Sequence, residues 1–376
     1  MNIRPKKIRI THIITGLNVG GAERALHSLL TGGLQGAFEN HVVSLMDEGY
    51  FAPLLRDAGV PVTCLNMSPG PPTVRAVWRL RQAMRAGSPD IIQGWMYHGN
   101  LAASLARRLA GGKAALSWNV RTSLEAQHMN PSTHWVIWTG AQLSRGPDAI
   151  IYNAHRSKSQ HVQQGYTPTN GLVIPNGFDA ERWHPDPNAK TRLCAELDVP
   201  KDAVLIGFVG RGHPQKDIPN LLSAFGIAAN SHPSAHLVCV GRGLDDFATD
   251  GVDLQRVRFL GQRNEVERLM PSFDILCLSS SSEGFPNVIG EAMACGVPCV
   301  TTDVGDAAAI VADTGWTVPP RNSAALAATL SQALAAPEEE RRARGTAARA
   351  RIEARYSLEY AVDQYRTLYE RLSGAE

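Results

Sequence analysis

The sequence predicts two α/β domains, each built on a doubly wound parallel sheet. Its 376 residues are too many for one ordinary hydrophobic core and suit two. Strand-like apolar runs alternate with helical patterns from end to end, and the alternation restarts after a Pro- and Asn-rich stretch that begins at Ile174. Alternation of this kind implies parallel strands with helices on both faces of each sheet.

The first half contains strand-like runs separated by helical segments. The runs begin at Ile8, His41, Pro61, Asp90, Ala114 and Ala149. Two of the predicted helices have the sequences GAERALHSLLTGGL and NLAASLARRLAGG. The second ends on a pair of glycines, which is a common way for a helix to stop.

The second half repeats the pattern, with runs that begin at Ala203, His236, Val257, Asp274 and Val297. The stretch IPNGFDAERWHPDPNAK interrupts it and is typical of an interdomain connector. We therefore expect an N-terminal domain of residues 1–178 and a C-terminal domain of residues 179–356. The Ala/Arg/Glu-rich stretch at about 333–355 is interpreted as a solvated helix.

The last segment, about residues 357–376, is amphipathic. Its apolar residues recur at helical spacing: Leu358, Ala361, Val362, Tyr365, Leu368, Tyr369 and Leu372. The apolar face of a terminal helix is stabilised by burial against another apolar surface. We expect this helix to cross back and complete the N-terminal domain.

Composition places the chain among globular proteins, with 44% hydrophobic and 19% charged residues. It contains no run of about twenty apolar residues, so no membrane-spanning helix is predicted. The apolar run near the start is short and lacks a cleavage site, which favours a buried strand and a cytoplasmic protein. The six cysteines fit neither a metal clip nor a disulfide framework and are expected to be buried thiols.

Charge is divided unevenly along the chain. Residues 1–178 contain 17 Lys and Arg against 8 Asp and Glu, whereas residues 179–376 contain 20 against 27. The segment TVRAVWRLRQAMRAG carries Arg75, Arg79, Arg81 and Arg85 beside a stripe of Val74, Val77, Leu80 and Met84. This pattern predicts either a helix that rests on an anionic membrane surface or a stripe that faces the core and leaves the arginines solvated.

The most informative motif is SSSSEGFPNVIGEAMACGVPCVTTD, which begins at Ser279. It follows a buried strand, turns through a loop, and enters a helix near Pro286. Gly296 and Pro298 then end that helix before the next strand. Loops at the carboxyl ends of parallel strands are where α/β sheets bind ligands.

Two glutamates of this motif, Glu283 in the loop and Glu291 in the helix, lie eight residues apart. The amides of Asn287, Val288 and Ile289 at the helix start could bind a diphosphate. Glu291 could then accept hydrogen bonds from ribose hydroxyls, while Glu283 faces a sugar. The alternative is an ordinary helix start with two surface glutamates.

A second loop, GFVGRGHPQKD from Gly207, offers two cations to a phosphate. Arg211 and Lys216 could neutralise a departing nucleotide diphosphate, a role that a divalent metal has in other transferases. No two aspartates in the chain are separated by a single residue, so a DxD metal motif is absent. We expect no metal and no cofactor.

Three further positions follow predicted strands of the first domain. Gly20 and Gly21 could form a turn whose amides meet a phosphate, or a simple strand-to-helix turn. A lone histidine is usually structural, but the place of His98 after a strand favours function. Arg121 could contact a substrate or form a structural ion pair.

Together these motifs resemble the retaining GT-B glycosyltransferases of family 4. The E-x7-E signature of that family matches Glu283 and Glu291, and its phosphate-binding Arg and Lys fall on Arg211 and Lys216. Its amino-terminal glycine loop is similar to Gly20-Gly21, and its histidine near the reacting carbon falls on His98. The resemblance covers nearly the whole chain.

The resemblance implies two Rossmann-like domains that face each other across a cleft, with the acceptor on the first and the nucleotide sugar on the second. It implies a retaining, front-face substitution in which Glu283 holds the sugar's hydroxyls and His98 orients the sugar near its 6-position. A UDP-sugar is the default donor. The acceptor would be a saccharide or a polyprenyl-linked precursor of an envelope polysaccharide.

The uneven charge and the resemblance together predict a cytoplasmic protein that is peripheral at the inner face of the cytoplasmic membrane. No nucleic-acid partner is expected. Three alternatives remain open on the same fold: a nucleotide-sugar epimerase, a phosphorylase, and a non-catalytic nucleotide-sugar-binding subunit. An epimerase would alter the donor without an acceptor, and a phosphorylase would release sugar phosphate.

Overall fold

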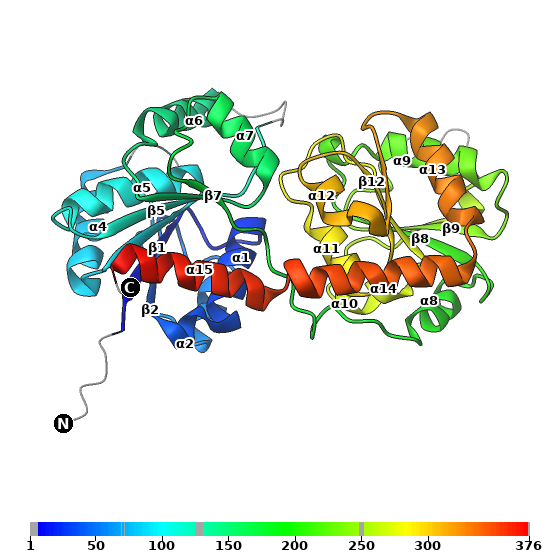
Figure 1. The fold of residues 1–376 in the computed structure, drawn as a ribbon, viewed down its shortest axis with the longest axis horizontal. Coiled ribbons are helices and arrows are strands. Elements are labelled where there is room, and N and C mark those ends of the chain that lie inside the picture. Colours follow the sequence, from blue (N-terminus) through cyan, green and yellow to red (C-terminus); the bar gives the residue numbers. More distant parts are fainter. Residues whose placement is uncertain (1–6, 69, 71, 125–130, 248–251, 375–376) are drawn as a thin grey trace. The chain divides into compact units, whose positions relative to one another are not determined.

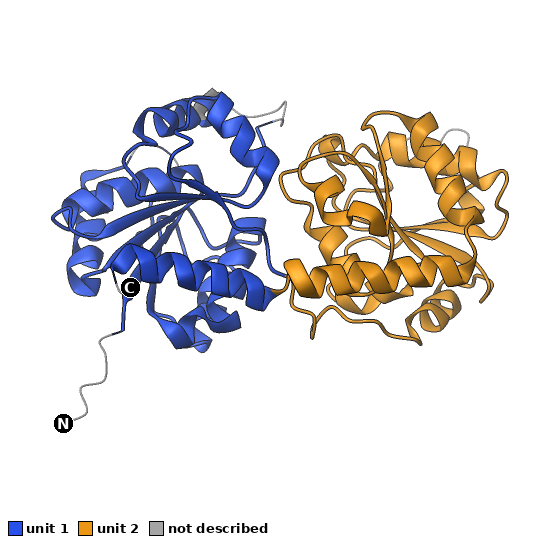
Figure 2. Ribbon diagram, in the orientation of Figure 1, with its two compact units in different colours: residues 1–177, 358–376 blue, residues 178–357 orange. Residues whose placement is uncertain are grey.

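The computed structural model describes residues 7–68, 70, 72–124, 131–247 and 252–374. The chain forms two compact units, which Figure 2 shows in different colours. Unit 1 consists of residues 1–177 and 358–376, and unit 2 consists of residues 178–357. The division falls inside the Pro- and Asn-rich stretch, between Gly177 and Phe178.

Unit 1 is built on a parallel sheet with the order β3-β2-β1-β4-β5-β6-β7. The strand order reverses between β1 and β4, as in a doubly wound sheet. The strands are β1 (Arg9–Ile14), β2 (Glu39–Ser44), β3 (Val62–Cys64), β4 (Ile91–Trp95), β5 (Ala115–Val120), β6 (Ala149–Tyr152) and β7 (Gly171–Val173). The helices are α1 (Gly21–Leu29), α2 (Gln35–Ala37), α3 (Phe51–Asp57), α4 (Val74–Gly87), α5 (Met96–Leu109), α6 (Pro131–Leu143), α7 (His155–Gln163) and α15 (Leu358–Ser373).

Each face of this sheet has its own apolar core, because side chains alternate along a strand. Ile10 and Ile14 of β1 pack with α1 and α15, whereas Ile13 packs with α4, α5 and α6. Figure 1 shows α15 and α1 on one side of the sheet and α4 and α5 on the other. Because helices cover both faces of the sheet, polar residues are exposed mainly in the loops at the carboxyl ends of the strands.

The carboxyl-terminal helix α15 belongs to the core of unit 1. Its apolar stripe is buried against α1 and the turn that follows α1. The hydroxyl of Tyr365 accepts hydrogen bonds from Asn119 Nδ2 at 2.6 Å and Arg121 Nη1 at 3.3 Å. The last segment of the chain thus completes a fold that began at β1.

Unit 2 contains a second parallel sheet, with the order β10-β9-β8-β11-β12-β13. The strands are β8 (Val204–Val209), β9 (Ala235–Val240), β10 (Val257–Phe259), β11 (Ile275–Leu278), β12 (Cys299–Thr302) and β13 (Trp316–Val318). The helices are α8 (Ala189–Leu197), α9 (Ile218–Ala229), α10 (Val266–Leu269), α11 (Asn287–Ala294), α12 (Ala307–Val311), α13 (Ser323–Ala335) and α14 (Glu338–Arg355). The predicted fold class, two Rossmann-like parallel-sheet domains, is confirmed.

One helix differs from its prediction. The stretch that was expected to be a solvated helix contains the end of α13 and all of α14. One face of α14, with Arg341, Gly345, Ala348 and Ile352, is buried, and the helix packs against α11. The interpretation of a wholly solvated helix is wrong, because small residues at helical spacing let α14 approach α11 closely.

Helix α4 turns most of its apolar stripe inward. Leu80 and Met84 are buried in the core, so the core-facing interpretation is correct for them. Arg79 donates a hydrogen bond to the carbonyl oxygen of Leu65 at 2.9 Å and is half-buried. Two large apolar residues remain on the surface, Val74 at 88% exposure and Trp78 at 56%, and the other three arginines of the helix are exposed beside them.

The state of the cysteines and the hydropathy of the helices agree with what the sequence predicts. All six cysteines are free thiols, five of them buried and Cys64 half-buried. Across the part of the chain that the structure describes, no helix is both long enough and apolar enough to cross a bilayer.

Candidate active site

Two loops at the carboxyl edge of the unit 2 sheet are joined by hydrogen bonds. The hydroxyl of Ser279, just after β11, donates to the carbonyl oxygen of Lys216 at 2.8 Å, and the amide of Ser281 donates to Gln215 O at 2.8 Å. Thr302 Oγ1 donates to Ser280 O from the end of β12. The loop that carries Glu283 is therefore held against the loop that follows β8.

This contact brings two predicted site residues together. Lys216 Nζ lies 2.6 Å from Glu283 Oε1, and the hydroxyl of Ser280 donates to the same oxygen at 2.8 Å. The side chains of Lys216 and Glu283 are 20% and 17% exposed. Partial burial reduces solvent screening, so the pair interacts more strongly than an ion pair on an open surface.

Arg211 lies in the same loop, next to a close crossing of two backbones. A Cβ atom on Gly212 would overlap the carbonyl oxygen of Gly243, and one on Gly241 would overlap the carbonyl oxygen of Gly210. The amide of Gly212 donates to Arg242 O at 2.7 Å across the crossing. The crossing fixes the backbone on both sides of Arg211, whose side chain is exposed and has no ion-pair partner among the described residues.

The amino terminus of α11 is formed as the sequence predicts, with Pro286 as the N-cap residue and Asn287 as the first helical residue. One of the three amides assigned to a diphosphate is occupied, because Ile289 N donates to Pro286 O at 3.1 Å. The expectation of a free amide at Ile289 is therefore wrong, since the first turn closes on itself. The assignment of Asn287 and Val288 to a diphosphate stays a prediction.

Glu291 is the fifth residue of α11 and is half-buried. Burial, with a smaller contribution from the Glu291 carboxylate, raises the pKa of Cys295 to about 12. The preceding residue, Gly290, leaves room for the ring of Phe178, which a Cβ atom would overlap. Phe178 also stacks on Phe285, with ring centroids 6.1 Å apart, so the helix that carries Glu291 is held in place by aromatic contacts.

In unit 1, His98 is the third residue of α5 and is exposed. Met96 adopts a φ of +61° where β4 passes directly into α5. This left-handed conformation is unfavourable for a residue other than glycine and often marks a functional turn. The neighbours of His98 are anchored: Tyr97 OH lies 2.8 Å from His161 Nε2, and Asn100 exchanges hydrogen bonds with Asn119.

The glycine pair before α1 differs in detail from a phosphate-binding turn. Gly20 is the N-cap residue and has an extended φ of −157°, and Gly21 has no atom within 4 Å of where a Cβ would lie. The carboxylate of Glu23 lies over Gly20, and burial raises the pKa of that carboxyl group. A carboxylate thus lies at the helix start to which a phosphate was assigned.

Arg121 has a structural environment. Its guanidinium donates to Tyr365 OH and Asn176 Oδ1 and lies 5.5 Å from the centre of the Trp95 ring. Burial lowers the pKa of this arginine, and its polar partners are uncharged. Of the two interpretations, a structural role is favoured, although through hydrogen bonds and a ring contact instead of an ion pair.

An apolar groove beside His98 was not predicted. It encloses about 1020 Å³. It is lined by Thr15, Leu45, Met46, Leu65, Met67, Ser68, Gly70, Pro72, Ala76, Val77, Leu80, His98, Leu101, Ala102, Leu105 and Val136. These residues come from the ends of β1, β2 and β3 and from α4, α5 and α6. No single motif could have revealed it, because the lining residues belong to several segments that are far apart in the sequence.

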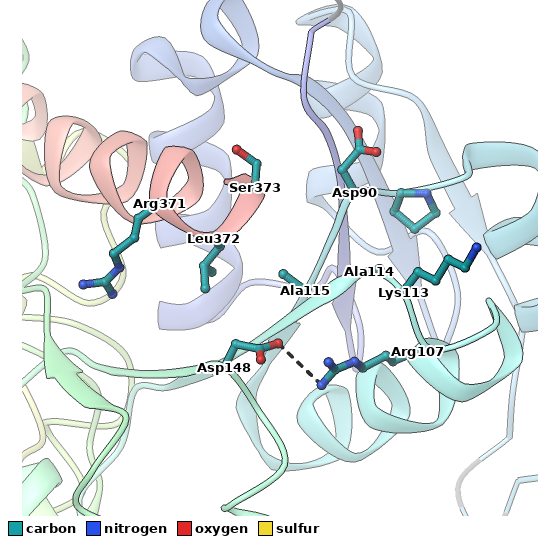
Figure 3. A pocket seen from close by; sticks show the side chains of 10 residues that line it. Asp90, Arg107, Lys113, Ala114, Ala115, Asp148, Arg371, Leu372 and Ser373 are labelled. Atoms are coloured by element: carbon teal, nitrogen blue, oxygen red, sulfur yellow. Dashed lines mark ion pairs between the residues drawn. The ribbon is translucent and has the colours of Figure 1, made fainter. Parts of the chain in front are cut away.

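A second hollow, of about 510 Å³, lies where β4, β5 and β6 begin (Figure 3). Arg107 forms an ion pair with Asp148 at 3.4 Å on its wall. Arg371 and Lys113 also line it, but Figure 3 shows their side chains pointing away from one another. The cations do not converge, so this hollow lacks the arrangement of an anion-binding site.

Comparison with known proteins agrees with this geometry. The model described as Glycosyltransferase Family 4 matches residues 19–182, and the model described as Glycosyl transferases group 1 matches residues 203–336. The N-acetyl-alpha-D-glucosaminyl L-malate synthase of Bacillus anthracis is 30% identical over 278 residues, which cover 72% of this chain and 71% of that protein. This chain belongs to glycosyltransferase family 4.

Other members and structures extend the comparison. The UDP-Gal:alpha-D-GlcNAc-diphosphoundecaprenol alpha-1,3-galactosyltransferase of Escherichia coli is 25% identical, and the alignment covers 65% of each protein. The crystal structure of Anabaena Alr3699/HepE in complex with UDP has a TM-score of 0.83 at 22% identity and covers 97% of this chain and 100% of that chain. The chain is thus a glycosyltransferase with the GT-B fold.

The structure brings some of the predicted site residues into contact. Lys216 and Glu283 are in contact, with Arg211 in the same loop as Lys216, whereas His98 and the glycine pair belong to unit 1. Among the described residues, no group of three or more His, Cys, Asp or Glu side chains could hold a metal ion. The serines that hold Lys216 and Glu283 together were missed, because a run of four serines resembles an ordinary loop.

Proposed function

We propose that the enzyme transfers a sugar from a UDP-sugar to an acceptor with retention at the anomeric carbon and without a metal. The contact between Lys216 and Glu283 carries this proposal. It places a cation and a carboxylate side by side at the carboxyl edge of the unit 2 sheet. A nucleotide sugar presents the complementary groups in the same order, a diphosphate and then a sugar with hydroxyls.

In this proposal the loop after β8 binds the leaving group. Arg211 and Lys216 stabilise the negative charge that develops on the diphosphate as the glycosidic bond breaks. The ammonium of Lys216 has three N–H donors, so it can hold Glu283 and a phosphate oxygen together. The amino terminus of α11, which begins with Asn287, Val288 and Ile289, adds the positive end of the helix dipole.

Glu283 is assigned to the hydroxyls of the donor sugar and Glu291 to the ribose. His98 is assigned to the donor sugar near its 6-position, and Gly20 and Gly21 to the donor phosphates. For a phosphate to bind at these glycines, the Glu23 carboxylate has to move or be protonated, since like charges repel.

The environment of Glu283 favours front-face substitution. Retention in two steps requires a carboxylate nucleophile about 5 Å from an acid. The groups that contact Glu283 are an ammonium and a hydroxyl, which suit a carboxylate that binds sugar hydroxyls. In front-face substitution the departing diphosphate oxygen takes the proton of the attacking hydroxyl, and the new bond forms on the same face of the sugar.

A lipid-linked acceptor at the cytoplasmic face of the membrane is the proposed destination of the sugar. The name of the E. coli relative describes a diphosphoundecaprenol-linked acceptor, and that of the Anabaena structure describes bound UDP. Unit 1 adds the exposed arginines of α4 next to Val74 and Trp78. Cationic and aromatic residues in one surface are typical of proteins that rest on anionic bilayers.

A two-stage experiment tests this function. Nucleotide sugars are first ranked by thermal shift, and the best binders are then incubated with saccharide and polyprenyl-linked acceptors. Transfer with retention, established by NMR of the product's anomeric proton, is the expected result. Donor epimerisation without acceptor, or sugar phosphate release on addition of inorganic phosphate, would replace this proposal with one of the other enzyme classes. Binding without any turnover would indicate a non-catalytic subunit.

A further inference from the structure

The apolar groove beside His98 lies at the carboxyl edge of the unit 1 sheet. Hydrogen bonds continue beyond β2 and β3, with Met67 N donating to Leu45 O at 2.9 Å, so the two loops stay together and form one wall. A second wall is formed by Val77 from α4 and Ala102 from α5, two helices that pack against each other. Both walls belong to unit 1, so the groove is complete within it.

The chemistry of the lining excludes a sugar as the main occupant. Of the sixteen lining residues, only Thr15, Ser68 and His98 have polar side chains, and no lining residue is Asp, Glu, Lys or Arg. A saccharide buried there would lose hydrogen bonds to water without replacing them, which is costly. A hydrocarbon makes no hydrogen bonds to water that it could lose, and each methylene that is removed from water makes the binding free energy more favourable.

The size and walls of the groove fit a chain-like ligand. About 1020 Å³ lies at the upper end of the range for ligand pockets, which is more than a single methyl or ring substituent requires. Met46 and Met67 are half-buried and flexible, so they can adapt to a chain of irregular shape. Val136 of α6 also lines the groove and adds a branched apolar side chain to its wall.

We propose that this groove binds the hydrocarbon chain of an amphiphilic acceptor whose reacting head group lies at His98. The proposal rests on the proposed function, because His98 marks the reacting end only if the enzyme transfers a sugar there. It adds a substrate class: acceptors in which an apolar chain is attached directly to the accepting head group. A free saccharide fills the head-group position and leaves the groove empty.

Alkyl β-D-glucosides test the proposal without knowledge of the natural acceptor. Hexyl, heptyl and octyl glucoside are titrated into the full-length protein by calorimetry, below their micelle-forming concentrations. The dissociation constant is expected to fall by about fourfold per added methylene, with a negative heat-capacity change. Glucose alone is expected to bind too weakly to detect. Equal affinities for the three glucosides would overturn the proposal.

Two matched pairs of variants locate the binding. Ala102→Phe fills the groove from α5 and is expected to raise the dissociation constant of octyl glucoside at least tenfold, whereas Ala86→Phe on the exposed side of α4 should not change it. Val77→Glu places a charge in the groove and is expected to have the same effect, and Val74→Glu, three residues away on the same helix, should have none. Unchanged affinity in both groove variants would show that the glucosides bind nonspecifically.

Sugar transfer to glucose and to octyl glucoside, measured together with glucoside binding, separates the two proposals. If octyl glucoside binds in the groove but no nucleotide sugar is used, the proposed function fails and the groove assignment stands. If a sugar is transferred equally well to glucose and to octyl glucoside, the function stands and the groove assignment fails.

Discussion

The ammonium of Lys216 and the carboxylate of Glu283 lie 2.6 Å apart, although the two residues are 67 positions apart in the chain. The first belongs to the loop after β8 and the second to the loop after β11, and these strands are neighbours in the sheet. Adjacent parallel strands place their carboxyl-end loops side by side. The pairing of the two charges is thus a consequence of the strand order.

The first prediction concerns Glu283. Glu283→Gln removes the charge but keeps the shape, and it should lower kcat by roughly 10- to 150-fold, since one charge-assisted hydrogen bond is worth about 1.5–3 kcal/mol. The double variant Lys216→Met/Glu283→Gln should lose less than the product of the single losses, because the residues are in contact. Steady-state kinetics of the three variants measure this. Strictly multiplicative losses would contradict a shared role.

The second prediction concerns Glu291. Glu291→Ala should raise the dissociation constant of UDP by roughly 10- to 150-fold, with a smaller effect on kcat, because the ribose is not the reacting part of the donor. Titration calorimetry with UDP measures it. Glu338→Ala, at an exposed position of α14, is the matched control. Unchanged UDP affinity in a folded Glu291→Ala variant would remove this residue from the donor site.

The third prediction is that activity survives excess EDTA. It follows from the absent DxD motif and from the placement of Arg211 and Lys216 in the loop after β8. Two protein cations can neutralise the departing diphosphate. Initial rates are measured after dialysis against EDTA, with and without added magnesium. A loss of turnover that magnesium restores would show that the cations are insufficient.

The fourth prediction concerns the surface of α4. The protein should sediment with anionic liposomes at low salt and stay in solution at high salt, because salt screens exposed charges. Changing Arg75, Arg81 and Arg85 to Glu should weaken partitioning by about 100-fold or more, at about 1 kcal/mol for each cation. Arg79 is left in place, since it holds the Leu65 carbonyl.

A matched control for that experiment changes Arg268, Arg342 and Arg355 of unit 2 to Glu, which alters the net charge equally. If both triple variants partition alike, only overall charge matters. If the unaltered protein stays in the supernatant at low salt, membrane association should be abandoned and a soluble acceptor preferred.

The fifth prediction concerns two buried histidines of unit 1. Burial lowers the pKa of His12 and that of His161 to about 4. In the unfolded chain a histidine has a pKa near 6.5, so between pH 6.5 and 4 the unfolded state binds more protons. The free energy of unfolding should therefore fall as the pH falls through this window, by up to roughly 3 kcal/mol for each histidine.

Urea unfolding at pH 7 and pH 4.5 measures this dependence. His161→Gln should reduce the difference between the two pH values, although it also removes the contact with Tyr97 OH. His184→Gln, at an exposed position, should leave the difference unchanged. A pH dependence that is the same in all three proteins would assign the effect to other groups.

Sequence patterns predicted most of the fold, because each central strand is a long apolar run. They missed β7 and β13, which have three residues each and lie at the edges of their sheets. The equally short edge strands β3 and β10 were predicted within the apolar runs that begin at Pro61 and Val257, whereas no such run was recognised at β7 or β13. The start of α5 was also placed too late, since Met96 enters the helix through a left-handed conformation that its sequence does not indicate.

The candidate site was predictable where it consists of a local motif. The loop and helix that carry Glu283 and Glu291 have the predicted form, since both lie within one strand–loop–helix segment. The hydrogen bond from Ile289 to Pro286, the Glu23 carboxylate over Gly20 and the apolar groove were not predictable. Each depends on side-chain conformation or on tertiary packing, which a sequence pattern does not indicate.

The backbone crossing around Arg211 determines which positions of the donor loop can change during directed evolution. Glycine is required at positions 212 and 241, because any side chain would occupy the space of a carbonyl oxygen. Position 211 has an exposed side chain on a backbone that its neighbours already define. A saturation library selected for folded protein should therefore return glycine at 212 and 241 and diversity at 211. Selection for sugar transfer should in addition retain arginine at 211, because its proposed role requires the charge and the fold does not.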